Sequence, residues 1–319
     1  MSDSDDVSLP KPLAAAVAEF EAWIQDELLA DQARSIPKTT LYHYTDLAAL
    51  QGIIEKQKIW CFLHSQQSDL TEVQFSMDIG RQVIRQEACR GNPAVKSFLL
   101  GLNDLLGNNP LGETFDFYFF SLSDHRDDPQ QWDEYGCKGT GFSVGLAPTL
   151  FQPDQPALLP RANENVFVSK VIYGRDATRS RHRHGVRKLA DIVGRVSLAN
   201  PDLVRGKTLQ AWFDIMNKGL IATLLIWNCL TAKAARFQNE RETRYILLGM
   251  RKVFDEWRRE HNGRKYVETH LPLSAPGNLT EIIVGPLAPV GAEDAMRAFL
   301  RDHGYPESIP VTRSVVSVR

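Results

Sequence analysis

The order of predicted strands and helices indicates an α+β fold. Short strands and helices are interspersed along the 319 residues without the regular β-α-β rhythm of a doubly wound sheet. A hydrophobic fraction of 43% and a charged fraction of 24% are ordinary globular values, so a packed core is expected. We predict mixed, mainly antiparallel sheets with helical insertions and an N-terminal helix.

The first 37 residues separate into a polar start and an amphipathic helix. Residues 1–10 have the composition of a disordered segment, and apolar residues from Leu13 to Leu29 then recur at helical spacing. The helix should end before Pro37. Its apolar stripe could pack on the main body, which most such stripes do, or bind a partner.

Residues 38–319 are predicted to form a single α+β domain with helical insertions at about 65–112 and 186–236. Strands are expected at 41–45, 59–62, 115–123, 142–146, 166–173, 244–248, 281–284 and 311–318. Helices are expected at 47–55, twice within 70–107 around a break at 91–93, at 131–135, and over most of 203–236. Glycines at 136, 139 and 141 permit close backbone approach.

Charge and composition argue against several classes of protein. The formal charge of -2 gives no global attraction to nucleic acid or to an anionic membrane. The basic run 175–188 could dock phosphates, or be an exposed flexible loop. The start is acidic and polar, unlike a signal peptide, and no apolar run is long enough to cross a bilayer, so a cytoplasmic location is expected.

Cysteine and acidic residues lack the spacing of a metal or disulfide scaffold. The four cysteines form no C-x-x-C pair and are expected to be free thiols. The clusters at 124–128 and 182–184 combine His with charged residues, yet neither has a recognised ligand spacing, so no metal site is predicted.

Two short strands carry polar pairs at alternate positions. His43 and Thr45 share one strand face, with Tyr42 and Tyr44 on the other, and could hold the hydroxyls and amide of a dinucleotide. Ser121 and Ser123 share a face of a strand that is otherwise Phe and Leu. Either pair could line a polar pocket or make structural hydrogen bonds.

An aromatic helical turn precedes the glycine loop. Trp132 and Tyr135 are three residues apart and should share a helix face, with Gln131 beside them. Such a pair is suited to stacking on a nicotinamide or adenine ring, whereas the alternative is that Trp132 fills the core.

A pair of carboxylates leads into a later strand. Glu240 and Glu242 share a strand face if the strand begins at Glu240, and Arg244 could neutralise a phosphate or pair with Glu242. A carboxylate near an anomeric carbon stabilises the positive charge that develops in glycosidic cleavage. A charged, solvated strand edge is the alternative.

Eight segments together resemble a large bacterial family known only as a domain of unknown function, similar to the AbiGi-type phage-resistance antitoxins. The segments are Leu41 to Thr45, Gly52-Ile53-Ile54, Ser68-Asp69-x-x-Glu72, Phe120 to Ser123, Gln131-Trp132-x-x-Tyr135-Gly136, Gly139-x-Gly141-Phe142, Phe237-x-x-Glu240-x-Glu242-x-Arg244 and Ser314 to Arg319.

The chain also resembles, more weakly, the ADP-ribosyltransferase superfamily, including DarT-like toxins, through the strand with His43 and Thr45, the S-x-S and the E-x-E. This resemblance implies a cleft between sheets in which His43, Tyr44 and Thr45 bind NAD. It further implies that Ser121 and Ser123 shape the nicotinamide pocket and that Glu242 is the catalytic carboxylate.

The leading hypothesis is therefore an enzyme that uses NAD as substrate, an ADP-ribosyltransferase or NAD glycohydrolase acting on an unknown macromolecule in phage defence or as a toxin. His43, Glu240 and Glu242 are the candidate catalytic residues, and the candidate NAD-binding residues are His43, Tyr44, Thr45, Ser121, Ser123, Gln131, Trp132, Tyr135 and Arg244. A non-catalytic antitoxin or sensor, and a metal-dependent nuclease, are the alternatives.

Overall fold

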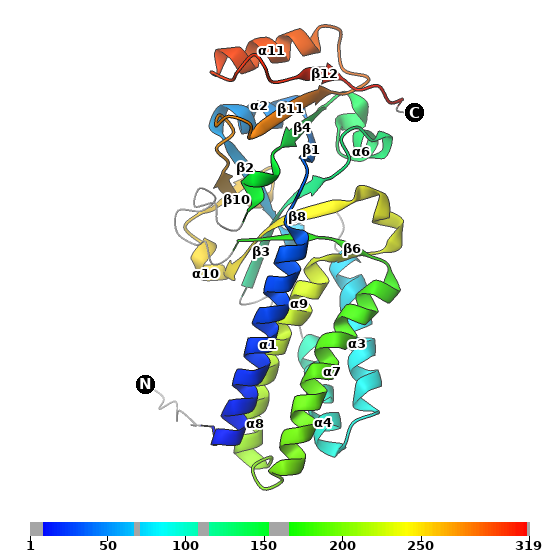
Figure 1. Cartoon of the computed structure of the whole chain (residues 1–319), viewed down its shortest axis with the longest axis vertical. Coiled ribbons are helices and arrows are strands. Elements are labelled where there is room, and N and C mark those ends of the chain that lie inside the picture. Colours follow the sequence, from blue (N-terminus) through cyan, green and yellow to red (C-terminus); the bar gives the residue numbers. More distant parts are fainter. Residues whose placement is uncertain (1–8, 67–70, 108–114, 153–165, 318–319) are drawn as a thin grey trace. The chain divides into compact units, whose positions relative to one another are not determined.

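The computed structural model describes residues 9–66, 71–107, 115–152 and 166–317 (Figure 1). Most of the segment expected to be disordered, residues 1–8, lies outside this described part. The chain divides into two compact units. A helical unit contains residues 1–31, 69–114 and 172–236, and a sheet unit contains residues 32–68, 115–171 and 237–319. The N-terminal helix and the two insertions expected within one domain thus form a unit with its own core.

The helical unit buries one continuous apolar core. Its helices are α1 (Lys11–Ser35), α3 (Thr71–Ala88), α4 (Pro93–Gly107), α7 (Arg175–Ala199), α8 (Gly206–Asp214) and α9 (Ala222–Leu230), with a π-helical segment at Ile215–Ile221. The predicted stripe of α1 is buried through Leu13, Phe20 and Ile24. This stripe therefore packs on the protein itself.

The basic run at 175–188 is the first half of α7, so the alternative of an exposed flexible loop was wrong. Buried residues such as Val186 and Leu189 give the helix an apolar face. Several basic side chains pair with carboxylates inside the unit: Arg181 pairs with Asp31, and Arg183 and Arg187 share Glu87. This pairing offsets part of the positive charge of the run.

The sheet unit contains an open, mostly antiparallel sheet in the strand order β12-β11-β4-β1-β3-β2-β10-β9, with β8 and β5 added beside β3. The strands are β1 (Leu41–Thr45), β2 (Lys58–Leu63), β3 (Phe115–Ser123), β4 (Phe142–Leu146), β5 (Val166–Lys170), β8 (Glu242–Met250), β9 (Arg258–His261), β10 (Arg264–His270), β11 (Leu279–Val284) and β12 (Val311–Arg313). Only β11 and β12 pair in parallel among the described strands of this sheet. The α+β prediction is confirmed.

Short helices and a small second ladder complete the fold. The helices are α2 (Leu47–Lys56), α6 (Pro129–Glu134), α10 (Arg251–Phe254) and α11 (Ala292–Asp302), with 3₁₀ turns at His64–Gln66, Cys137–Gly139, Pro148–Phe151 and Ala235–Glu240. Strands β6 (Ile172–Tyr173) and β7 (Ala232–Lys233) pair within the helical unit. The strand expected at 166–173 is therefore two strands, β5 and β6. No described helix is long and apolar enough to cross a membrane.

Strand β3 organises the sheet because three strands pair with it. β8 pairs along its whole length on one edge, from Ser123 opposite Glu242 to Phe115 opposite Met250. On the other edge β1 pairs only at Ser123, and β2 pairs only at Phe119 and Tyr118. The ladder is thus interrupted at Phe120, Ser121 and Leu122, where β1 and β2 diverge.

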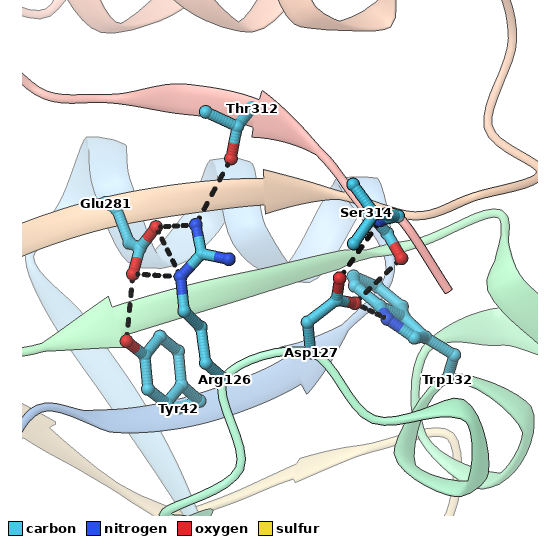
Figure 2. Close-up of polar contacts among 8 residues, drawn as sticks. Tyr42, Arg126, Asp127, Trp132, Glu281, Thr312 and Ser314 are labelled. Atoms are coloured by element: carbon cyan, nitrogen blue, oxygen red, sulfur yellow. Dashed lines mark hydrogen bonds and ion pairs between the residues drawn. The ribbon is translucent and has the colours of Figure 1, made fainter.

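The C-terminal segment is held by side chains after a short strand (Figure 2). The strand expected at 311–318 ends at Arg313, because Asp127 accepts hydrogen bonds from the Ser314 hydroxyl and the Val315 amide. Asp127 also accepts a 2.6 Å hydrogen bond from the indole N–H of Trp132. Beside it, Arg126 forms an ion pair with Glu281, whose carboxylate also accepts from Tyr42. These contacts fix the loop between β3 and α6.

Candidate functional site

A buried ion pair lies at the start of β8. Glu242 accepts hydrogen bonds from the Nε and an Nη of Arg244, at 2.9 and 3.1 Å, and both side chains are at most 5% exposed. The two residues share a strand face because they are two positions apart. Burying two charges is costly unless they are paired, so this pairing is what makes both tolerable inside the protein. The sequence predicted the pair as one of two roles for Arg244.

Ser121 lies beside this ion pair on the adjacent strand. Its hydroxyl donates a 2.6 Å hydrogen bond to Oε1 of Glu242, and the residue is exposed. Register pairs Ser121 with Arg244 across the two strands, so the three polar side chains share one face of the sheet. The carboxylate is thereby held by a guanidinium and oriented by a hydroxyl at the protein surface.

His43 contacts Ser121 from β1, which lies on the edge of β3 opposite β8. Its Nδ1 lies 3.0 Å from the Ser121 carbonyl, and its ring lies 4.2 Å from that of Phe120. Register pairs Tyr42 with Ser123, so the His43 side chain leaves β1 on the face opposite Ser121 and crosses the gap between β1 and β2. The imidazole satisfies a carbonyl that the interrupted ladder leaves unpaired.

The environment of His43 keeps its ring neutral and fixes its tautomer. Burial lowers the pKa of His43 to about 4, against the opposing effect of the Ser121 carbonyl. Because a carbonyl only accepts, Nδ1 carries the proton and Nε2 has a free lone pair. Nε2 can therefore accept a hydrogen bond from a hydroxyl or an amide.

Glu240 does not share a strand face with Glu242. β8 begins at Glu242, and Arg241 between them has φ of 42°, a left-handed conformation that breaks the strand. Glu240 ends the preceding 3₁₀ turn, where its buried carboxylate accepts a 2.9 Å hydrogen bond from the hydroxyl of Tyr135. The expectation of a common face was wrong because it assumed that the strand already began at Glu240.

Ser123 and Tyr135 occupy contrasting environments. The hydroxyl of Ser123 is buried, donates to the Glu240 carbonyl and accepts from the His125 amide, so it stabilises the turns after β3 and before β8. The ring of Tyr135 is 45% exposed. It remains accessible to a ligand, next to the Glu240 carboxylate.

Trp132 belongs to the core of this unit. Its ring is fully buried and lies edge-on to Tyr44 at 4.8 Å, and its indole N–H is used by Asp127. The hydroxyl of Tyr44 is likewise used, because it donates to the carbonyl of His125 and accepts from the amide of Asp128. The two rings differ in accessibility, since Trp132 is buried whereas Tyr135, the residue after the end of α6, is exposed. The core alternative weighed for Trp132 is the one observed.

Gln131 and Thr45 are also buried, and the glycine loop passes close to Thr45. A Cβ on Gly141 would lie 2.3 Å from the Thr45 carbonyl, so only glycine fits there. The predicted close approach of the loop is confirmed. It serves packing against the end of β1.

His64 is a member of the site that the sequence did not reveal. It follows β2, and its ring lies 5.6 Å from Phe119, over which the guanidinium of Arg244 is positioned at 5.0 Å. Burial, followed by the charge of Arg244, lowers the pKa of His64 to about 4. A single His after a short strand forms no recognisable motif. Only the pairing of β2 with β3 shows that His64 lies near Phe119 and Arg244.

Among the described residues no group of three or more His, Cys, Asp or Glu could hold a metal ion. The four cysteines are free thiols, with Cys61 and Cys229 buried and Cys89 and Cys137 exposed. Comparisons with protein-family models, with curated proteins and with solved structures find no match to this chain.

Proposed function

We propose that the chain cleaves the bond between nicotinamide and ribose in NAD and transfers ADP-ribose to a macromolecule. The observation that carries the proposal is the convergence at Ser121: its hydroxyl orients Glu242 and its carbonyl holds His43. Three sequence segments thus contact Ser121, with Glu242 and Arg244 on its side-chain face of the sheet and His43 reaching its carbonyl from a side chain that leaves β1 on the other face.

Glu242 supplies the electrostatic stabilisation in this proposal. When the C1′–N bond breaks, its electron pair goes to the nicotinamide nitrogen and positive charge develops on the ribose. A preorganised carboxylate stabilises that charge, and the Ser121 hydrogen bond fixes its direction. An acceptor hydroxyl or amine, or water, then bonds to C1′ and loses a proton.

His43 and Arg244 bind rather than react in this proposal. The Nε2 lone pair of His43 accepts a hydrogen bond from a ribose hydroxyl or the carboxamide, because burial keeps the ring neutral at pH 7. The guanidinium of Arg244 holds the Glu242 carboxylate through two hydrogen bonds. The exposed ring of Tyr135 offers a stacking surface nearby.

A non-catalytic antitoxin or sensor is the second candidate, and the same ion pair favours it. Both oxygens of Glu242 already accept from Arg244, so the carboxylate is partly neutralised before any substrate arrives. A binding module would use this arrangement to recognise NAD without cleaving it.

Incubating the full chain with NAD separates the two candidates. The transferase proposal requires release of nicotinamide that Ser121→Ala slows, because that variant removes the Ser121 hydrogen bond to Glu242 while keeping the charge of the carboxylate. Binding of NAD with no nicotinamide released would support the module. Absence of both binding and release would contradict the NAD proposal altogether.

A further inference from the structure

The helical unit contains a cavity of about 460 Å³ that is unrelated to the candidate site. It lies between α4 and the segment formed by α8 and the π-helical turn. Its walls combine apolar groups with acidic and amide side chains; the lining includes Asp104, Leu105, Leu209, Phe213, Asp214 and Asn217. None of the described lining residues is basic. The described lining thus combines two carboxylates with apolar side chains, and one of the carboxylates, Asp214, also accepts a hydrogen bond from Gln210.

One buried atom in this wall lacks a partner. Asn217 is 4% exposed, and its Oδ1 makes no hydrogen bond within the part of the chain that the structure describes. A buried acceptor without a donor costs free energy, so natural proteins rarely keep one without a use. Asn217 lies in the π-helical segment, a backbone form that often marks functional sites. The Oδ1 atom of Asn217 could therefore accept a hydrogen bond from a bound ligand.

We propose that this cavity binds a small organic cation, a primary ammonium or guanidinium carried on a short apolar chain. The cationic head donates to Asn217 Oδ1 and is attracted by Asp104 and Asp214, while the chain packs on Phe213 and the leucines. Phe213 is fixed for this contact because its ring stacks on that of Phe98 at 3.8 Å.

The apolar walls favour an organic cation over a metal ion. A divalent metal such as Ca²⁺ or Mg²⁺ needs six or more oxygen ligands at short distances. A cavity of this volume lined by two leucines and a phenylalanine instead matches a ligand with carbon atoms as well as charge. The proposal does not depend on NAD chemistry.

Calorimetric titration of the full chain with butylammonium chloride tests the proposal, and butanol serves as the neutral isostere. We expect millimolar or tighter binding of butylammonium and none of butanol, because the charge supplies the recognition. Asp214→Asn and Asn217→Leu should each weaken binding about tenfold or more. Asp202→Asn, an exposed aspartate of the same unit, should leave it unchanged.

Three results would overturn the proposal: no binding of butylammonium, equal binding of butanol, or a heat of binding that is measured only with MgCl₂ or CaCl₂. Asn217→Leu has a second readout. It removes a buried unpaired acceptor, so its melting temperature should equal or exceed that of the wild type while butylammonium no longer raises it. A variant that retains the wild-type shift with butylammonium would also refute the role of Asn217.

Discussion

At the scale of single residues, Arg244 is a buried positive charge with Glu242 among its partners. Arg244→Met keeps most of the side-chain volume and leaves the Glu242 carboxylate buried without its guanidinium. We expect the free energy of unfolding to fall by about 3 to 5 kcal/mol. Denaturant titration measures this loss.

Arg126→Met is the matched control, because it breaks an ion pair with Glu281 in which the arginine is 49% exposed. That change should cost no more than about 1 kcal/mol. If the two variants lose the same stability, the ion pair of Glu242 and Arg244 is not the buried structural element described here.

Residue-level prediction succeeded where strand alternation and pairing act together. Alternation alone places Ser121 and Ser123 on one face, and the structure adds that Ser121 is exposed whereas Ser123 is buried. Alternation also places His43 opposite its tyrosine neighbours, yet its bond to the Ser121 carbonyl depends on where β1 leaves β3. That point of divergence is set by long-range pairing, which one sequence does not reveal.

At the scale of elements, the β9-β10 hairpin turns through Asn262 and Gly263, both with positive φ, at 49° and 74°. A Cβ on Gly263 would meet nothing within 4 Å, so Gly263→Ala changes only the backbone cost. We expect about 1 kcal/mol of destabilisation, measured by thermal or chemical unfolding.

Gly52 within α2 gives the opposite expectation. A Cβ there also meets nothing within 4 Å, but the residue is helical, so Gly52→Ala should stabilise by about 0.5 to 1 kcal/mol. Since neither added Cβ meets another atom, the difference in stability between the two variants reports the backbone conformation alone. Destabilisation by both, or by neither, would show that φ does not decide the outcome.

Element prediction failed where the local signal was overlooked or outweighed. The Asn262-Gly263 dipeptide is a strong hairpin signal that could have revealed β9 and β10. The basic density of 175–188 suggested a loop, but carboxylates on α1 and α3 offset the repulsion and permit a helix. Those partners are distant in sequence, so composition alone misleads.

At the scale of the whole molecule, neutral histidines in both units, of which His182 is buried and His43 and His64 are half-buried, make stability depend on pH. Burial is the largest cause that lowers the pKa of His43, His64 and His182 to about 4, from an ordinary value of 6.5. The unfolded chain therefore binds protons between these values and the folded chain does not. Stability should be full above about pH 6.5 and fall by several kcal/mol towards pH 4, in line with the linkage of proton binding to folding.

His182→Gln tests this account, because His182 is 1% exposed and its Nε2 lies 3.0 Å from the Ser76 hydroxyl. Denaturation at pH 7 and at pH 5 should show a smaller difference for the variant than for the wild type. An unchanged pH dependence in His182→Gln would mean that this histidine titrates normally.

The division into two units was not predicted, although most of the helices of the helical unit were. The helix at 13–29 and both helical insertions were recognised, but no local pattern tells that they pack on one another. Their association buries side chains such as Phe20, Phe98 and Trp212, which are far apart in sequence. Contacts of this kind become visible only when the chain is folded.

The most direct test of the central claim compares Glu242→Gln with Glu240→Gln in nicotinamide release and NAD affinity. Glu242→Gln removes the charge that stabilises the transition state, so release should fall by about 10² to 10³ while NAD affinity changes far less. Glu240→Gln should retain most of the activity, and a melting curve checks that each variant is folded. Equal release by the wild type and by folded Glu242→Gln would contradict the proposed role of Glu242.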